Sequence, residues 1–183
     1  MSAAGTQVGI ARTRASAVAG GPPIVDEAAI RAALAEVPDP ELPMLSVVDL
    51  GIIHRIEIGP AGGGIRVEIL PTFVGCPALD MIKASIAERV RVFGRPVEVA
   101  ATFEVPWTSD RISRAGHAAL AAAGIAPPGQ AAAPGLIALE PRVPCPLCGS
   151  RDTVLENVFG PTQCRTIRFC RACRQPFEAV KPV

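Results

Sequence analysis

The chain has 183 residues, of which 49% are hydrophobic and 4% aromatic, and its formal net charge is +1. This length allows one modest core plus a smaller appended unit, and no apolar run approaches the roughly 18 to 20 residues that a membrane-spanning helix needs. Residues 142–183 carry seven Lys or Arg against three Asp or Glu, an excess too small to indicate nucleic-acid binding by charge alone. We therefore expect neither a membrane partner nor a nucleic-acid partner.

Residues 1–22 are predicted to form a disordered extension, because they contain Arg12 and Arg14 but no continuous apolar segment of the kind found in secretory signals. Six cysteines follow, four of them paired in C-x2-C spacing. Without a signal peptide, this pattern indicates metal ligands more than disulfides. We expect a cytoplasmic protein.

A first unit is predicted over residues 23–125. It begins with a helix from Asp26 to Val37, which Pro38 ends, followed by the rigid segment 39–43 with its two carboxylates, Asp39 and Glu41. Strands over 51–58 and 65–69 flank a glycine-rich loop and predict an antiparallel hairpin. The loop does not match a phosphate-binding loop, because a strand and not a helix follows it.

The segment 71–77 places Cys76 between the second strand and an amphipathic helix whose apolar stripe is Leu79, Ile82, Ile86, Val90 and Phe93. Pro77 suits the first helical position, so Cys76 is predicted at the N-cap. Free backbone N–H groups and the helix dipole there favour the thiolate, the form that binds metals, whereas Asp80 in the first turn opposes it. The alternative is a small cysteine that only packs.

A strand over 97–105 follows this helix, and a right-handed crossover would lay it parallel to strand 65–69. The prediction is an α+β unit with a three-stranded mixed sheet and a last helix that starts at Thr108 or Ser109 and ends at Ala123. Loops at the carboxyl ends of the two parallel strands would bring Cys76 and Trp107 to one edge, the usual place for a site.

Residues 126–142, rich in Pro, Ala and Gly, are predicted to be a linker, and residues 143–183 a zinc ribbon with strands over 153–159, 166–169 and 177–180. The ribbon carries the pattern C-x2-C-x21-C-x2-C, formed by Cys145, Cys148, Cys170 and Cys173. Four thiolates close the coordination sphere, so the zinc is expected to be structural. Cys164 lies outside this four-cysteine pattern. It is either a partly exposed accessory thiol or a residue that only packs.

Several motifs together resemble a known family: Asp39-Pro40-Glu41, Val48-Asp49-Leu50-Gly51-Ile52-Ile53, Pro71-Thr72 and Gly75-Cys76-Pro77. They are similar to the SufT-like domain of iron–sulfur cluster assembly proteins, also called the MIP-eighteen family. With Pro106-Trp107-Thr108, the ribbon cysteines, the segment 159–164 and the segment 173–177, nearly all of the chain except the N-terminal extension resembles the PaaD family. Members of that family are accessory proteins of the bacterial phenylacetyl-CoA epoxidase (phenylacetate-CoA oxygenase) system.

The resemblance implies an accessory protein of phenylacetate catabolism and not an enzyme, in which Cys76 transiently holds iron or an iron–sulfur cluster. Asp39, Glu41 and Thr72 would belong to the same site; the alternative for the two carboxylates is a role in turns and helix capping. The implied partners are the di-iron oxygenase subunit and the ferredoxin-type reductase of the epoxidase, together with the iron–sulfur assembly machinery. The alternative function is a non-catalytic structural or regulatory partner subunit of that oxygenase.

Overall fold

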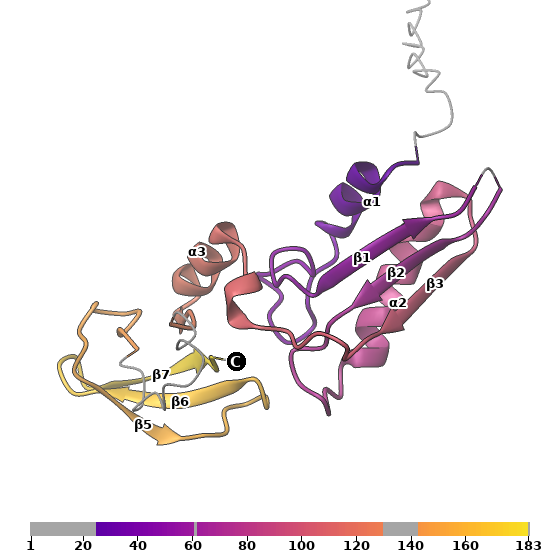
Figure 1. Cartoon of the computed structure of the whole chain (residues 1–183). Helices are drawn as coiled ribbons and strands as arrows, with labels where there is room; N and C mark the ends of the chain where they lie inside the picture. The colour runs from indigo at the N-terminus through magenta and orange to yellow at the C-terminus, as the bar shows by residue number, and fades with distance from the viewer. Residues whose placement is uncertain (1–24, 61, 130–142, 183) are drawn as a thin grey trace, which may run out of the picture.

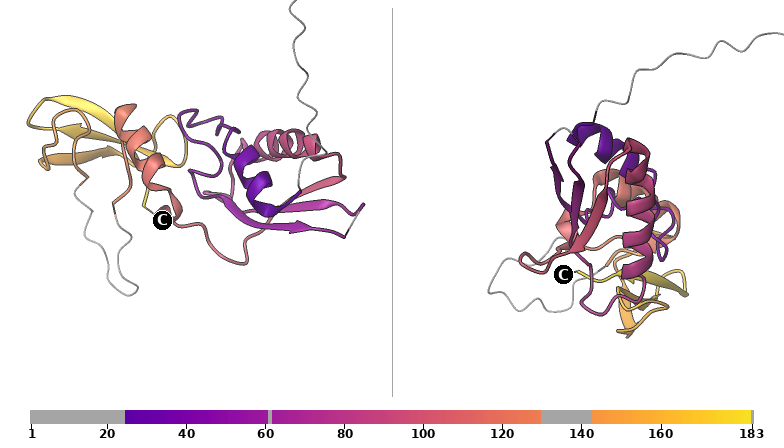
Figure 2. Two further views of the ribbon diagram at one scale, coloured as in Figure 1. Left: turned by 90° about the horizontal axis from the view of Figure 1, so that it is seen from above. Right: turned by 90° about the vertical axis from the view of Figure 1, so that its right-hand side faces the viewer.

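The computed structural model describes residues 25–60, 62–129 and 143–182 (Figure 1). The predicted extension over 1–22 and most of the predicted linker lie outside these ranges. Figure 2 shows a three-stranded sheet and a second sheet at opposite ends of the molecule, with the helix α3 between them. Within the described residues, no helix is both long enough and apolar enough to span a bilayer.

Helix α1 spans Glu27–Leu34 and begins as predicted, since the Asp26 side chain accepts a hydrogen bond from the Ala29 N–H at 2.7 Å. It ends three residues earlier than predicted. The reason is Pro38, which disfavours a helical conformation at Val37. The last turn therefore tightens, with the Val37 N–H donating to the Leu34 carbonyl, and Val37 still packs in the core.

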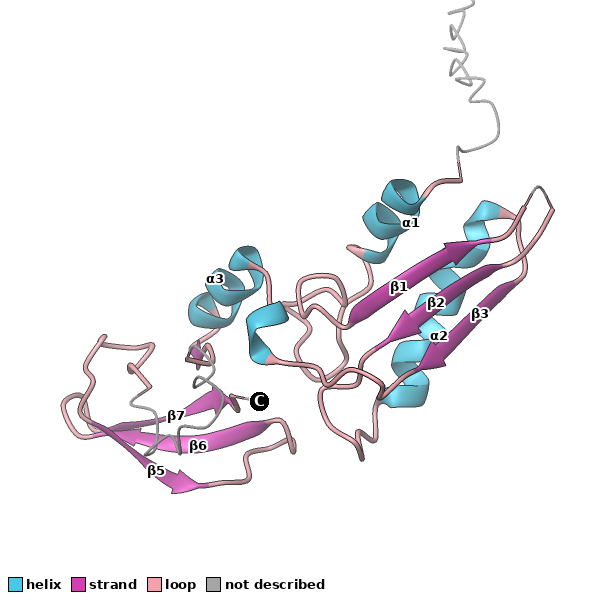
Figure 3. Ribbon diagram, viewed as in Figure 1, coloured by secondary structure: helices cyan, strands magenta, loops and turns pink. Residues whose placement is uncertain are grey.

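The first sheet has the order β1-β2-β3, with β1 at Ile53–Ile58, β2 at Ile65–Ile69 and β3 at Val97–Ala101. Strands β1 and β2 are antiparallel and β2 and β3 are parallel, which confirms the predicted mixed sheet. Helix α2, at Leu79–Val90, covers one face of it (Figure 3). The pairing of β1 is irregular between Ile53 and Arg55, and Ile52, Ile53 and Ile56 are all buried.

The last helix of this unit starts later than predicted. A single 3₁₀ turn, η2 at Ser109–Arg111, comes first, and α3 spans Arg114–Ala122. Ser113 caps α3, because its hydroxyl accepts from the Gly116 N–H at 2.9 Å. The η2 turn packs closely on Gly51, whose φ is 72° and where a Cβ atom would lie 2.2 Å from the Arg111 carbonyl oxygen. Only glycine fits there.

The second sheet has four strands in the order β4-β7-β6-β5: Ile125–Ala126, Gln175–Val180, Arg165–Cys170 and Thr153–Asn157. The three ribbon strands were predicted, with different ends. Strand β4 was not: it pairs parallel with β7, so the predicted linker begins inside this sheet. Val180 of β7 packs in the same hydrophobic cluster as the first sheet, so the ribbon is joined to the first unit by a shared core.

Candidate functional site

Four cysteines at one end of the ribbon form a metal centre. The sulfurs of Cys145, Cys148, Cys170 and Cys173 all lie within 4.8 Å of one another, with 3.8 Å between Cys145 and Cys173 and 3.6 Å between Cys148 and Cys170. A tetrahedral zinc ion with Zn–S bonds of about 2.3 Å needs its sulfurs about 3.8 Å apart. The donor set and its spacing therefore fit a closed zinc site with no position left for a substrate.

A second site lies where the first unit meets the ribbon. A pocket there is lined by side chains from both units: Asp39, Glu41, Leu42, Leu50, Ile52, Ile69, Pro71, Thr72, Phe73, Cys76, Leu79, Ile82, Trp107, Gln163, Cys164, Val180 and Lys181. Its walls are mainly apolar, and its reactive groups are two thiols, two carboxylates and the amine of Lys181. It leaves about 50 Å³ for water-sized groups, and since a single water needs about 15 Å³, it suits a small inorganic ligand.

Cys76 follows β2 and precedes α2, as predicted, but it is not the N-cap. The cap is Ala78, two residues later, because residues 73–79 form two successive turns in which Cys76 N–H donates to Phe73 and Leu79 N–H donates to Cys76. The sulfur nevertheless faces the backbone N–H groups of Ala78 and Leu79. Cys76 is partly exposed, so its thiol is reachable from the pocket.

The expectation that this position favours the thiolate is wrong for the protein without bound metal. Burial raises the pKa of the Cys76 thiol, and the negative charges of Glu41 and Asp39 raise it further, against the opposing hydrogen bonds from Ala78 and Leu79. Cys76 therefore carries its proton at neutral pH. A metal cation must displace that proton in order to bind.

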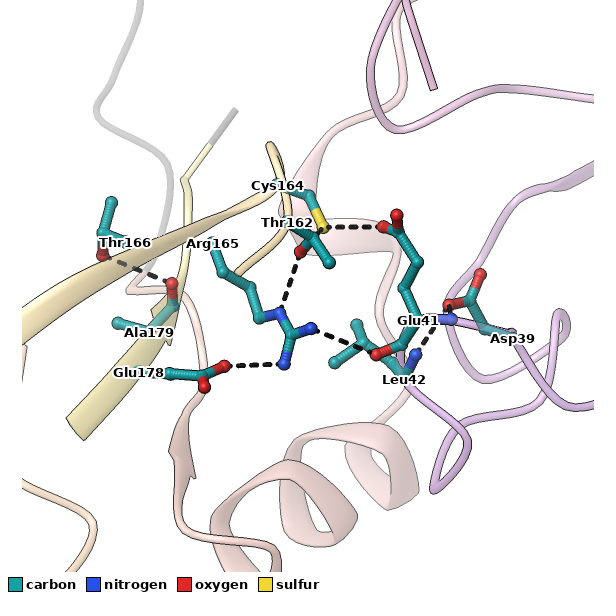
Figure 4. Close-up of polar contacts among 9 residues, drawn as sticks. All are labelled: Asp39, Glu41, Leu42, Thr162, Cys164, Arg165, Thr166, Glu178 and Ala179. Carbon is teal, nitrogen blue, oxygen red and sulfur yellow. Dashed lines mark hydrogen bonds and ion pairs between the residues drawn. The ribbon is translucent and has the colours of Figure 1, made fainter. Parts of the chain in front are cut away.

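The two predicted carboxylates line the same pocket as Cys76 but differ in their contacts. Asp39 is 5% exposed, and its Oδ1 atom accepts from the backbone N–H groups of Glu41 at 2.9 Å and Leu42 at 2.8 Å (Figure 4). Burial raises the pKa of the Asp39 carboxyl. Asp39 thus shapes the turn that presents Glu41, whose side chain extends toward the ribbon.

Cys164 is the site residue that the sequence left open. It lies in the connection between β5 and β6, and its sulfur is 3.6 Å from Oε2 of Glu41 and 3.2 Å from the Thr162 hydroxyl (Figure 4). Burial raises the pKa of this thiol as well, and the charge of Glu41 adds to the effect. No sequence pattern could show that a loop of the ribbon reaches the Asp39 turn.

Arg165 holds this junction together. Its guanidinium donates to the Glu41 carbonyl at 3.3 Å and pairs with the Glu178 carboxylate at 2.6 Å. It also donates to the Thr162 hydroxyl at 2.9 Å. One side chain therefore connects the Asp39 turn of the first unit to the loop that carries Cys164.

Trp107 and Thr72 of the first unit also line the pocket. Trp107 is buried, and its indole N–H donates to the Leu50 carbonyl at 3.0 Å. Thr72 lies in the loop directly after β2. Both residues line the pocket with Cys76, as expected for loops at the carboxyl ends of two parallel strands.

Both units of the chain match known protein families. Residues 27–102 match the family described as iron–sulfur cluster assembly protein, and residues 130–181 match the PaaD zinc beta ribbon domain. A protein of Escherichia coli that is named as a subunit of 1,2-phenylacetyl-CoA epoxidase is 35% identical over 161 residues, covering 87% of this chain and 94% of its own.

Two further proteins resemble the first unit alone. The Fe-S protein maturation auxiliary factor YitW of Bacillus subtilis is 32% identical over 95 residues, or 50% of this chain and 89% of its own. A solved structure of the domain of unknown function DUF59 from Bacillus anthracis is 26% identical, with a TM-score of 0.47, and covers 51% of this chain and 90% of its own. Since the match to the Escherichia coli protein spans both units, this chain belongs to the PaaD family, with an iron–sulfur cluster assembly domain followed by a zinc ribbon.

Proposed function

We propose that this protein is a cytoplasmic maturation factor that holds iron or an iron–sulfur cluster at Cys76 for a short time and delivers it to the phenylacetyl-CoA epoxidase complex. The observation that carries the proposal is the position of Cys76: a partly exposed thiol in a small pocket that also contains Glu41 and a second thiol. The relatives named as maturation factors match the unit that carries Cys76.

The chemistry of the thiol suits a transient ligand. A thiolate is a soft donor that binds iron and iron–sulfur clusters. Because burial and two carboxylates raise the pKa of Cys76, release of the cargo returns the sulfur to a stable protonated form. Binding then requires loss of the proton and delivery requires its return, which keeps the complex weak enough to pass its iron on.

Delivery also needs contact with a client protein. Apolar side chains are exposed beside the pocket: Phe73 is 42% exposed and Val74 82% exposed, in the same loop as Cys76. Exposed apolar groups next to a reactive site are typical of protein-binding surfaces. The clients we propose are the di-iron oxygenase subunit and the ferredoxin-type reductase of the epoxidase.

The test is co-expression of the epoxidase subunits with this protein or with its Cys76→Ser variant, followed by measurement of iron in the purified subunits. The proposal predicts clearly lower iron occupancy with the variant. Circular dichroism and zinc content of the variant should equal those of the wild type, because Cys76 is not among the four cysteines of the zinc centre. Full occupancy with a folded Cys76→Ser variant would reject the proposal.

A second candidate is a partner subunit of the oxygenase that carries no cargo. The mainly apolar lining of the pocket favours it, as does the naming of the Escherichia coli relative as a subunit. It predicts that the Cys76→Ser variant supports full iron occupancy, while deletion of the whole protein lowers the activity or assembly of the complex.

A further inference from the structure

We propose that Cys164 is the second sulfur ligand of the cargo, so that an iron–sulfur cluster is held between the two units by Cys76 from the first and Cys164 from the ribbon. This inference rests on the proposed function and adds to it: the ribbon supplies a ligand as well as a zinc centre. It also explains why the two domains occur together, since the site is incomplete without the loop that precedes β6.

The loop that carries Cys164 forms part of the wall of the pocket that contains Cys76. Gln163, Cys164, Val180 and Lys181 form the ribbon side of the pocket that contains Cys76. The backbone of the loop is fixed there, because the Lys181 N–H donates to the Cys164 carbonyl at 2.9 Å. Cys164 therefore lines a pocket that already contains a thiol, and the two thiols come from different units of the protein.

The Cys164 sulfur has polar neighbours. A cysteine that only fills space usually packs among apolar groups. The Cys164 sulfur instead contacts the Thr162 hydroxyl at 3.2 Å and the Glu41 carboxylate at 3.6 Å. Arg165 ties the same loop to the Glu41 carbonyl at 3.3 Å. These contacts hold the thiol beside a carboxylate, at a polar position of a pocket whose other walls are mainly apolar.

Spacing indicates the kind of cargo. Among the described residues, the zinc cysteines are the only group of three or more potential ligand atoms that lie within 4.8 Å of one another. Cys76, Cys164 and a carboxylate thus line one pocket, but their ligand atoms do not all come within this distance of one another. The ligands of a single metal ion would. In a cluster with two irons, each iron takes two outer ligands. Cys76 would bind one iron and Cys164 the other, with carboxylate oxygens of the pocket or small-molecule thiolates at the remaining positions.

Loading of such a cluster is a ligand exchange. Each cysteine sulfur displaces a thiolate of dithiothreitol from one iron, so that one Fe–S bond forms as another breaks. The departing thiolate takes up the proton that the cysteine thiol loses, and no electron changes hands. Glu41 Oε2 lies close enough to Cys164 to take the proton from that thiol. Delivery reverses both steps: thiols of the client replace the two sulfurs, which regain their protons.

The experiment uses the full chain with zinc bound, loaded without oxygen by ferric chloride, sodium sulfide and dithiothreitol. Iron and sulfide per chain are measured, and then the rate at which an iron chelator removes the iron. We expect Cys164→Ser to lose its iron at least tenfold faster than the wild type. The matched control is Val158→Ala, which alters an exposed side chain of the same connection between β5 and β6 but lies outside the pocket lining, and it should retain iron as the wild type does. Cys76→Ser should not load.

Three results would overturn the inference. If Cys76→Ser fails to load while Cys164→Ser retains iron as the wild type does, Cys164 is not a ligand and the proposed function stands. If both variants retain iron, both proposals fall. If Val158→Ala loses iron as fast as Cys164→Ser, the effect comes from the shape of the loop and not from the sulfur.

A second measurement needs no variant. The wild type is alkylated with iodoacetamide before and after loading, and each cysteine is followed by peptide mass spectrometry. We expect the cluster to protect both Cys76 and Cys164. Protection of Cys76 alone would contradict the inference while leaving the proposed function intact.

Discussion

The sulfur of Cys164 lies 3.6 Å from Oε2 of Glu41, although 123 positions separate the two residues in the sequence. This contact joins the turn that Asp39 shapes in the first unit to the loop that precedes β6 in the ribbon. Because Glu41 also raises the pKa of Cys76, a single carboxylate acts on both thiols of the pocket. The site is therefore a product of the two-unit arrangement and not of either unit alone.

Glu41→Gln should make both pocket thiols more reactive. Removing the negative charge lowers the pKa of Cys76 and of Cys164, since Glu41 raises both. We expect the pH profile of alkylation by iodoacetamide to shift to lower pH at these two cysteines. The measurement is peptide mass spectrometry across a pH series, with Glu156→Gln on the exposed side of β5 as the control. An unchanged profile at Cys76 would show that Glu41 does not act on it.

Asp39→Ala should destabilise the protein by about 1 to 3 kcal/mol, the cost of leaving buried N–H groups without an acceptor. The groups affected are the N–H groups of Glu41 and Leu42, which donate to Asp39 Oδ1. Asp39→Asn keeps an acceptor oxygen in the same place and should cost much less. Urea unfolding of the three proteins measures the difference. Equal destabilisation by both variants would mean that the charge of Asp39 matters more than its hydrogen bonds.

Cys148→Ser should release the metal of the ribbon and unfold it, because a small metal-bound unit derives most of its folding free energy from the metal. Zinc content, circular dichroism and the protease resistance of residues 143–182 report the change. Cys164→Ser is the matched control: it also removes a ribbon thiol, yet it should retain zinc. A Cys148→Ser variant that resists protease as the wild type does would disprove the four-thiolate site.

Low pH should weaken the contact between the turn that carries Asp49 and the start of α3. Hydrogen bonds from the hydroxyls of Ser113 and Ser46 lower the pKa of Asp49. Since this pKa lies below its unfolded value of about 3.9, the contribution of Asp49 is fully present above about pH 4 and is lost as pH falls through the folded pKa. Asp49→Asn should flatten the acid limb of a plot of stability against pH. The exposed Asp110→Asn serves as control, and a steep limb in Asp49→Asn would refute this assignment.

Much of the fold follows from local patterns. Alternation in residues 65–69 and the three- and four-residue spacing from Leu79 to Val90 predicted β2 and α2, and the crossover rule then gave their parallel neighbour β3. Helix ends were less predictable, because competing caps decide them: Ser113 and not Thr108 or Ser109 begins α3. Strand β4 has only two residues, too few for any periodic signal.

The candidate site was predictable only in part. The spacing of the ribbon cysteines predicted the zinc centre, and the position of Cys76 between a strand and a helix predicted that it belongs to a site. The pKa of Cys76 could not be read from the sequence, because it depends on burial and on carboxylates that arrive from a distant turn. Cys164 joined the site through a tertiary contact, and such a contact has no pattern along the chain.

The most direct test of the account is transfer itself. The protein is loaded with radioactive iron and sulfide, freed of unbound iron, and mixed without oxygen with iron-free epoxidase subunits, after which the iron on each protein is counted over time. We predict that iron moves from the wild type to an epoxidase subunit and that Cys76→Ser, which cannot load, delivers none. Iron that stays on the wild type, or that reaches the subunits equally well from mixtures with Cys76→Ser, would contradict a carrier role for Cys76.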